Sequence, residues 1–362
     1  MTGVRRADAR GARRFHPLFA ALVLLSLAAS PAAAIVYVTN NGQDTNNCLS
    51  PATACRSITR GIAAAAVGDI VSVGPGIYGD IDGDGLFTIG TGDEIPTLAH
   101  PDCVVDVDNF GVRIRSTGNL TTPTVITAGG ADMHVVCVNE SQVELRGFTL
   151  TRNGSTKPAV LVDVATTRTS LFRNLAVGTG AGFSLDGDDH RVMDNRALAT
   201  NGTGFSLRGT GFHYLARRNV SMDNAGHGFY VGDIDALLLH LNVAGGNFLT
   251  GVFVDTGAAA VRLEKNHLLG NRQHGLQVAA GTAFSQLRRN NIFGNGTEVG
   301  LSPSNCGIFN DSGAALNAAN NFWGAASGPG VDPADAVCNG IGASTTTAPL
   351  YPAQSVGLTS FR

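Results

Sequence analysis

The chain has 362 residues, of which 47 are glycine, 43% are hydrophobic and only 15% are charged. This composition supports a sizeable buried core and excludes an intrinsically disordered chain. The 25 basic side chains stand against 28 acidic ones, a formal net charge of −3. That sign, together with the lack of a zinc-finger, P-loop or dinucleotide-binding motif, argues against a nucleic-acid partner.

Residues 1–34 have the pattern of a secretory signal peptide. Five arginines form a basic leader, PLFAALVLLSLAA is a short apolar run, and PAAA offers small residues for cleavage before Ile35. Without this leader the balance becomes 20 basic against 27 acidic side chains, a net charge of −7. No later stretch approaches the ~20 apolar residues of a membrane span. We therefore expect a protein that is secreted, periplasmic or at the cell surface, with no membrane span.

Six cysteines follow the leader, and an even number in an exported chain predicts disulfides. The favoured pairs are the local ones: Cys48 with Cys55, Cys103 with Cys137, and Cys306 with Cys338. A metal site is the alternative reading of these cysteines. No CxxC or HxxxH spacing supports it.

An acidic loop, GDIDGDGLFTIGTGDE, spans residues 79–94. Its first half matches the D-x-D-x-D-G pattern of a calcium loop through Asp80, Asp82, Asp84 and Gly85. In that pattern alternating oxygens converge on the ion and glycine permits the sharp turn. The second half departs from the pattern, and Asp93 or Glu94 is placed to supply the missing ligand. Calcium is therefore a candidate cofactor, more structural than catalytic, and a solvated acidic turn is the alternative. No motif indicates copper or a redox cofactor.

From residue 170 onward the sequence repeats about every 23 residues. One marker is an asparagine in each repeat: Asn174, Asn195, Asn219, Asn242, Asn266 and Asn290. A second marker follows the first five of them: AGFSL at 181, TGFSL at 203, HGFYV at 227, TGVFV at 250 and HGLQV at 274. Periods of 20 to 50 residues indicate solenoids, in which each coil buries its apolar face on its neighbours.

Apolar residues alternate with period two near both markers. Three residues before each asparagine stand Leu171, Val192, Ala216, Leu239, Leu263 and Leu287. The second marker contributes Phe183, Phe205, Phe229, Val252 and Leu276. Period two is typical of strands whose alternate side chains point inward. The sequence therefore predicts an all-β parallel coil with two or three short strands per turn.

The marker asparagines are expected to be structural rather than catalytic. At a corner between strands, an inward asparagine can stack on its equivalent in the next coil and bond to unpaired backbone groups. Glycine is expected at the same corners because it accepts positive φ without steric cost. His227 and His274, beside such glycines, are expected at surface turns rather than as ligands.

Two terminal segments carry a family resemblance. VYVTNNGQDTNNCLSPATACRSITRGIAAAAVGDIVSVGPGIY, from Val36, and NNFWGAASGPG, at 320–330, resemble the first and last coils of many β-helices. With the repeats, the chain resembles the right-handed parallel β-helix proteins of the pectin-lyase-like superfamily over roughly residues 36–330. This implies a right-handed parallel β-helix (solenoid). Because the superfamily includes polysaccharide lyases, hydrolases, epimerases and surface proteins, it implies no single activity.

Both ends of such a coil need a cover, because an unpaired strand and an apolar cross-section invite aggregation. Ile58, Ile62 and the alanines 63–66 predict a short amphipathic helix over the first coil. Phe322 and Trp323 are the expected plug at the other end, with sugar stacking as the alternative role of Trp323. We divide the chain into a signal peptide (1–34), an N-terminal cap and first coils (35–100), β-helix repeats (101–325), and a C-terminal cap and tail (326–362).

Outward side chains at equivalent positions of successive coils form surface columns about 4.8 Å apart per coil. We expect a basic stripe formed by Arg217, His240, Arg262, Glu264 and Arg288. In a net-acidic protein, such a face suits the carboxylates of a uronic-acid polymer. The alternative is a solvated face whose long side chains cover apolar stems.

Catalysis on such a polymer needs further groups. A lyase needs a base for the proton α to the carboxylate and a cation for the developing charge. The resemblance implies lysine or arginine as base and often calcium as cation, which makes Lys265, beside Glu264, the catalytic candidate. A hydrolase would need two carboxylic acids about 5 to 9.5 Å apart. The cluster Asp186, Asp188 and Asp189 is the candidate for that role, and turn formation is the alternative.

Three function classes follow: an enzyme acting on acidic polysaccharide by elimination or epimerisation, a noncatalytic carbohydrate-binding protein, and a structural surface or adhesion protein. We favour a monomer that binds or processes acidic polysaccharide, with a polysaccharide or cell-surface glycan as partner.

Overall fold

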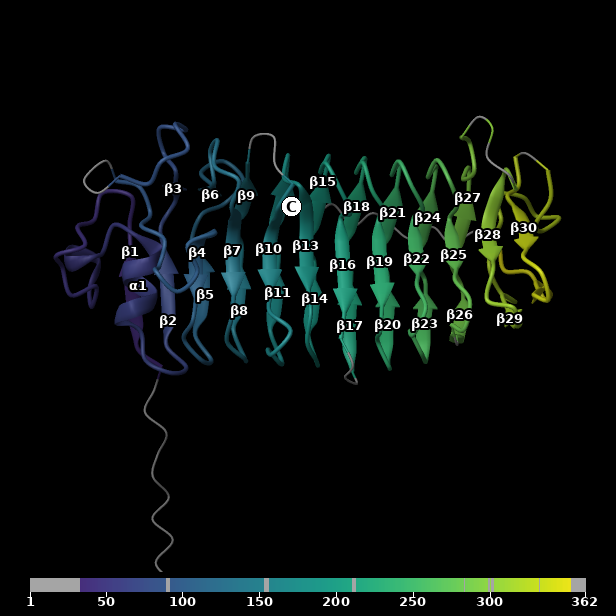
Figure 1. Cartoon of the computed structure of the whole chain (residues 1–362), viewed down its shortest axis with the longest axis horizontal. Coiled ribbons are helices and arrows are strands. Elements are labelled where there is room, and N and C mark those ends of the chain that lie inside the picture. Colours follow the sequence, from purple (N-terminus) through teal and green to yellow (C-terminus); the bar gives the residue numbers. More distant parts are fainter. Residues whose placement is uncertain are drawn as a thin grey trace, which may run out of the picture. The chain divides into compact units, whose positions relative to one another are not determined.

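Short strands wind into three parallel sheets in the computed structural model, which describes residues 33–88, 92–152, 156–209, 213–282, 284–298, 300, 303–331 and 333–352 (Figure 1). Residues from Ala33 onward form one unit, and the expected signal peptide lies almost entirely outside the described residues. Each strand pairs with its equivalent one coil later. In one such series Ala216 lies opposite Leu239, which lies opposite Leu263. The resemblance therefore holds for the fold, a right-handed parallel β-helix.

The strands of each sheet follow one another along the coil. Sheet A contains, in spatial order, β1 (Ile35–Val38), β2 (Ile70–Val73), β5 (Arg113–Ser116), β8 (Glu144–Arg146), β11 (Ser170–Phe172), β14 (Arg191–Met193), β17 (Tyr214–Arg217), β20 (Leu237–His240), β23 (Val261–Glu264) and β26 (Phe284–Arg288). Sheet B contains β3 (Gly76–Gly79), β6 (Thr124–Thr127), β9 (Thr149–Thr151), β12 (Leu175–Val177), β15 (Arg196–Leu198), β18 (Val220–Met222), β21 (Val243–Gly245), β24 (His267–Leu269) and β27 (Asn291–Phe293).

Sheet C contains β4 (Cys103–Val107), β7 (His134–Val138), β10 (Pro158–Val162), β13 (Ala181–Leu185), β16 (Phe205–Arg208), β19 (Phe229–Gly232), β22 (Val252–Val254), β25 (Leu276–Val278), β28 (Cys306–Asn310) and β30 (Ala336–Asn339). A small separate sheet pairs β29 (Ala315–Asn317) with β31 (Ser344–Thr346). Within the described residues the helical elements are η1 (Pro51–Thr53) and α1 (Ile58–Ala64).

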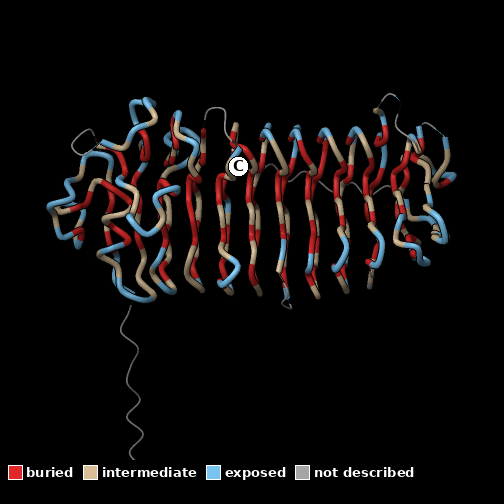
Figure 2. The backbone as a smooth tube through the Cα atoms, viewed as in Figure 1, coloured by how far each residue is buried: buried red, intermediate tan, exposed pale blue. Residues whose placement is uncertain are grey.

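The core fills the inside of the coil, where buried residues recur at alternate strand positions (Figure 2). Both inward columns expected from the sequence are buried. Phe183, Phe205 and Phe229 stack with ring centroids 5.0 and 4.9 Å apart. Offset aromatic stacking of this kind adds to the burial of apolar area, so it holds successive coils in register.

The marker asparagines form a buried ladder at the corner between sheets A and B. Asn242 is typical: its Oδ1 accepts the backbone N–H of Asn219 at 2.9 Å, and its Nδ2 donates to the Ala216 carbonyl at 2.9 Å. The ladder continues beyond the expected members to Asn321, which accepts the Asn290 N–H. A second ladder, not expected from the sequence, runs through Thr200, Asn224, Asn247, Asn271, Asn295 and Asp335.

The prediction that glycine stands at these corners because it accepts positive φ is wrong for the glycine of the second marker. Gly228 does not have positive φ. Instead, a Cβ there would lie 2.5 Å from the Gly251 carbonyl oxygen and 2.8 Å from Asn247 Nδ2, so the close approach to the second ladder requires glycine. Positive φ, between 55° and 59°, belongs to the residue before each marker asparagine: Arg173, Asp194, Arg218, Leu241, Lys265 and Arg289.

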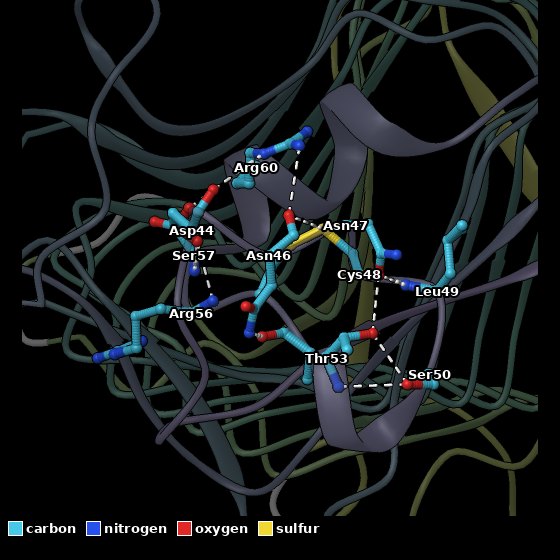
Figure 3. The surroundings of a disulfide bond; sticks show 12 residues. Asp44, Asn46, Asn47, Cys48, Leu49, Ser50, Thr53, Arg56, Ser57 and Arg60 are labelled. Carbon is cyan, nitrogen blue, oxygen red and sulfur yellow. Dashed lines mark hydrogen bonds between the residues drawn. A yellow bond between two sulfur atoms is a disulfide. The ribbon is translucent and has the colours of Figure 1, made fainter.

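The N-terminal cap has the expected helix. Ser57 caps α1 by accepting the Arg60 N–H, and α1 buries Ile58 and Ile62 over the first coil. The preceding loop is closed by the Cys48–Cys55 disulfide, and the Asp44 carboxylate accepts the backbone N–H groups of Arg56 and Ser57 (Figure 3). These local bonds order a loop that would otherwise leave the strand edge open.

The other expected disulfides are also present, Cys103–Cys137 between β4 and β7 and Cys306–Cys338 between β28 and β30. At the C-terminal end the Trp323 side chain is fully buried, so it packs in the cap and offers no surface for sugar stacking. Phe322 packs edge-on against Phe293. No helix in the described part of the chain is long and apolar enough to cross a membrane.

Candidate functional site

The outer face of sheet A carries the expected basic stripe and extends it. The strand register aligns one outward column, the outer column, through Ser72, Arg115, Arg146, Phe172, Met193, Arg217, His240, Glu264 and Arg288. Arg262 stands two residues before Glu264, in the neighbouring outward column. Period-two strands place these residues on one side of the sheet, so the column is a surface feature of about nine coils.

The N-terminal part of the outer column was missed because the marker asparagine is absent from those coils. Arg115 forms a two-point ion pair with Glu144, with distances of 2.8 and 3.0 Å. Arg146 and Arg173 each lie over the Phe172 ring, 4.8 and 4.9 Å from its centroid. These cation–π contacts orient both guanidinium groups without a carboxylate.

The middle of the outer column is electropositive. No described carboxylate lies within ion-pair distance of Arg217, and its buried Nε has no hydrogen-bond partner among the described residues. Partial burial lowers the pKa of His240, and the cations Arg217 and Lys265 lower it further. His240 is therefore neutral near pH 7, while Arg217 supplies positive charge beside it.

The C-terminal part of the basic stripe is partly neutralised, because two guanidinium groups share one carboxylate. Glu264 Oε1 lies 3.2 Å from Arg262 Nη2 and 3.2 Å from Arg288 Nη2. Burial raises the pKa of Glu264, but the hydrogen bond from Arg262 and the charge of Arg288 outweigh it and hold the pKa below its usual range. Of the arginines expected to bind an acidic polymer, Arg217 is therefore the one without an ion-pair partner among the described residues.

Lys265, the catalytic candidate, lies at the left-handed bend with φ of 57° and not in the outer column. It lies close enough to His240 to lower the pKa of that imidazole. The alternative cluster of aspartates occupies the turn between β13 and β14, as its composition suggested. Burial raises the pKa of Asp186, and Asp189 lies in a pocket with Arg168.

Two histidines differ from expectation. His274 is buried, with 4% of its surface exposed, and packs against Phe309. His227 stacks on Phe253 with centroids 4.9 Å apart, and its Nδ1 accepts the Thr250 N–H. Burial lowers the pKa of each to about 4. His274 is therefore a packing residue rather than a surface turn residue, and His227 is half-buried against Phe253, an outward aromatic side chain of sheet C.

The acidic loop brings together only part of the expected calcium set. Carboxylate oxygens of Asp80, Asp82 and Asp93 lie within 4.8 Å of one another, whereas Asp84 is not in the group. Asp80 and Asp93 are buried, with 1% and 5% of their surface exposed. The Asp80 oxygens accept the N–H groups of Gly83 and Gly85. Backbone donors therefore already offset part of the negative charge.

Glu94 has a different role. Its two oxygens accept the N–H groups of Ile58 and Thr59 at 2.6 and 3.0 Å, so it caps the N-terminus of α1. Burial raises the pKa of Glu94 to about 7, although these hydrogen bonds oppose the shift. The acidic loop thus ends on the capping helix and fixes it to the first coil.

Comparison with known proteins places the chain in context. Residues 117–328 match the family described as periplasmic copper-binding protein (NosD). No curated protein matches the chain.

Several solved structures are similar in fold. A lacto-N-biosidase from Eubacterium ramulus is 11% identical with a TM-score of 0.49, covering 88% of this chain and 68% of its own. An alginate lyase from a Paenibacillus species is 13% identical with a TM-score of 0.47, covering 88% and 98%. The A-module of a mannuronan C-5 epimerase from Azotobacter vinelandii is 16% identical with a TM-score of 0.40, covering 79% and 92%. Identities and TM-scores this low identify no shared activity.

Proposed function

This chain belongs to the NosD family, and we propose that this member is an extracytoplasmic protein that binds acidic polysaccharide along the outer face of sheet A. The three disulfides agree with an oxidising compartment and with the periplasmic location in the family description. Export by cleavage of residues 1–34 is part of the proposal.

The observation that carries the proposal is the outer column. A linear polymer lying along the coil axis would pass one outward side chain about every 4.8 Å. Arg146 and Arg217 offer guanidinium groups that are not ion-paired with any described carboxylate. Guanidinium matches the planar geometry of a carboxylate, which suits a uronic-acid polymer better than a neutral one.

Copper, named in the family description, does not fit the residues of this chain. Copper favours cysteine, methionine and imidazole ligands. All six cysteines are in disulfides. Among the described histidine, cysteine, aspartate and glutamate side chains, the one group of three with converging ligand atoms consists of Asp80, Asp82 and Asp93. An all-oxygen set suits hard cations, so the proposal includes no step through copper.

We propose that the same acidic group binds calcium as a structural ion. Two of its three carboxylates are buried, and three negative charges within 4.8 Å repel one another unless a cation lies between them. The loop joins sheet B to the capping helix through Glu94, so an ion there would stabilise the cap.

A finer form of the proposal is lyase-type elimination with Lys265 as the base. Lys265 lies beside the outer column, where a bound uronate would pass. Lys265→Ala should then abolish release of unsaturated product while polymer retention persists. If wild type and Lys265→Ala both retain polymer and neither releases unsaturated product, the protein binds polysaccharide without catalysis.

The binding proposal is tested by native electrophoresis in gels that contain polygalacturonate, alginate or a neutral galactan. Wild type should be retarded only in the acidic gels, and the retardation should fade as salt rises above about 0.1 M because the contacts are exposed. Arg217→Ala should reduce retention by up to about fivefold, as expected for the loss of one exposed charge contact.

Arg262→Ala is the matched control, because it also removes one positive charge but from a guanidinium already paired with Glu264. A smaller loss for Arg262→Ala than for Arg217→Ala would support a site centred on Arg217. Identical mobility of wild type and Arg217→Ala in every gel would refute the proposal and favour a structural surface or adhesion protein.

A further inference from the structure

A polar pocket of about 400 Å³ opens beside the outer face of sheet A, where the chain turns from sheet C into sheet A. Its lining residues come from four successive coils: Gln142, Arg168, Ser170, Asp189, Arg191 and His213. None of them was among the expected binding residues, apart from Asp189 as a candidate acid. The volume lies in the range of small-molecule sites, and every lining side chain can donate or accept a hydrogen bond.

The fold builds this pocket by repeating one backbone conformation. Gln142, Arg168, Asp189 and His213 have φ of 62°, 59°, 58° and 76°, and each stands two residues before an outward position of sheet A. A non-glycine residue rarely adopts positive φ. Four in register at adjacent corners therefore hold their side chains in one row, with Ser170 and Arg191 as the adjoining row.

The charges in the pocket are unequal. The Asp189 carboxylate lies 3.9 Å from Arg168 Nε, within ion-pair distance, and 3.6 Å from His213 Nδ1. Arg191 is exposed, and no described carboxylate lies within ion-pair distance of it. Two guanidinium groups against one carboxylate leave one uncompensated positive charge, which a single anionic group would balance.

We infer that this pocket binds one sugar unit that carries an oxyanion, with the anion on Arg191 and Arg168. The ring hydroxyls would bond to the remaining polar groups, Gln142, Ser170 and Asp189, which offer both donors and acceptors. Arg191 lies two residues before Met193 of the outer column, so the pocket adjoins the face that binds polymer. The inference rests on the proposed function and adds to it a subsite that recognises one acidic residue of the chain.

The test is calorimetric titration of the full-length protein with glucuronate, glucose 6-sulfate, glucose and inorganic sulfate. Glucuronate and glucose 6-sulfate distinguish a carboxylated from a sulfated unit, and glucose lacks the anion. Arg191→Ala should weaken binding of the preferred acidic sugar about tenfold or more, because it removes a charge-assisted hydrogen bond. Arg191→Lys should restore only part of the binding, since lysine keeps the positive charge but lacks the planar guanidinium group that can form two parallel hydrogen bonds. Arg272→Ala, which removes an exposed arginine outside sheet A, is the matched control.

The inference is supported if either acidic sugar binds to wild type, binding is lost in Arg191→Ala, and binding is kept in Arg272→Ala. Any of three results overturns the inference: glucose binds as tightly as the acidic sugars, neither acidic sugar binds, or Arg191→Ala binds the acidic sugar as tightly as wild type does. Electrophoresis in polymer-containing gels distinguishes failure of the pocket inference from failure of the proposed function. If acidic gels retain wild type while no acidic sugar binds, the pocket inference alone fails. If an acidic sugar binds while no acidic gel retains wild type, the polymer proposal alone fails.

Discussion

Asn242 shows how a single side chain specifies a corner of the coil. Its Oδ1 accepts from both the backbone N–H and the side-chain Nδ2 of Asn219, and its own Nδ2 donates to Asn266 Oδ1 and to the Ala216 carbonyl. The residue before it, Leu241, is in the left-handed conformation. The turn leaves backbone groups that no strand pairs, and the asparagine supplies their partners. This explains why a buried polar residue recurs where an apolar one would pack.

Glu94 is a second residue whose environment has a measurable consequence. Burial raises its pKa from 4.5 to about 7. The folded state therefore favours the protonated form more than the unfolded state does, so its contribution to the free energy of unfolding is fully present below pH 4.5. That contribution should fall as pH rises to about 7 and then level off. The size is on the order of 3 kcal/mol, from 1.36 kcal/mol per pKa unit.

Urea unfolding of wild type and Glu94→Gln between pH 4 and 8 measures this contribution. The difference between the two curves should change across that window, because glutamine keeps an acceptor for the α1 N–H groups but cannot ionise. Glu140→Gln, which replaces a partly exposed carboxylate, should track wild type. A constant difference between Glu94→Gln and wild type at all pH values would contradict the assigned pKa.

At the scale of elements, the strands and their inward columns were predictable because period two and the repeat are local properties of the sequence. The second ladder had the same kind of signal, since Asn224, Asn247, Asn271 and Asn295 each stand five residues after a marker asparagine. The role of Gly228 was not predictable, because it depends on how closely the next coil approaches. Interactions across coils are set by register rather than by neighbours in sequence.

The site was predictable only in part for the same reason. Alignment on the marker asparagine found Arg217 and His240 but not Arg115 or Arg146, whose coils lack that marker. The ion pairs of Glu264 with Arg262 and Arg288 decide which cations are free. They depend on side-chain conformations that a residue pattern does not contain.

The acidic loop gives a prediction at the element scale. Calcium should raise the melting temperature of wild type relative to EDTA. An ion present at 100 times its Kd adds about 2.7 kcal/mol to the free energy of unfolding. Asp82→Asn should lose this response because it removes a ligand of the group. Without calcium, the variant should be at least as stable as wild type, since one of three mutually repelling charges is gone.

Asp108→Asn is the control for this measurement. Asp108 is an exposed aspartate outside the acidic group, so the variant should respond to calcium as wild type does. Equal melting temperatures of wild type in calcium and in EDTA would instead identify the loop as a solvated turn held by its backbone hydrogen bonds.

At the scale of the whole molecule, the solenoid separates side chains that a globular fold could gather. Equivalent positions in adjacent coils lie about 4.8 Å apart, and positions on different sheets face different directions. His227 and His274 are two coils apart, each two residues before a strand of sheet C, whereas His240 and His267 belong to sheets A and B. A three-ligand site needs ligand atoms that converge, either from neighbouring coils of one face or from a single loop. In this chain only the carboxylates of the acidic loop meet that condition among the described residues.

The distribution of ligands predicts how this NosD-family member responds to copper. The oxidised protein should retain less than one equivalent of Cu(I) or Cu(II) after equilibration with a competing chelator, because its cysteines are in disulfides and its described histidines do not converge. Reduced and denatured protein is the positive control, since its six thiols should take up Cu(I). Metal analysis after gel filtration measures both forms. One equivalent held by the native oxidised protein, and lost on replacing His240 or His267 by alanine, would show that a copper site assembles from groups this structure keeps apart.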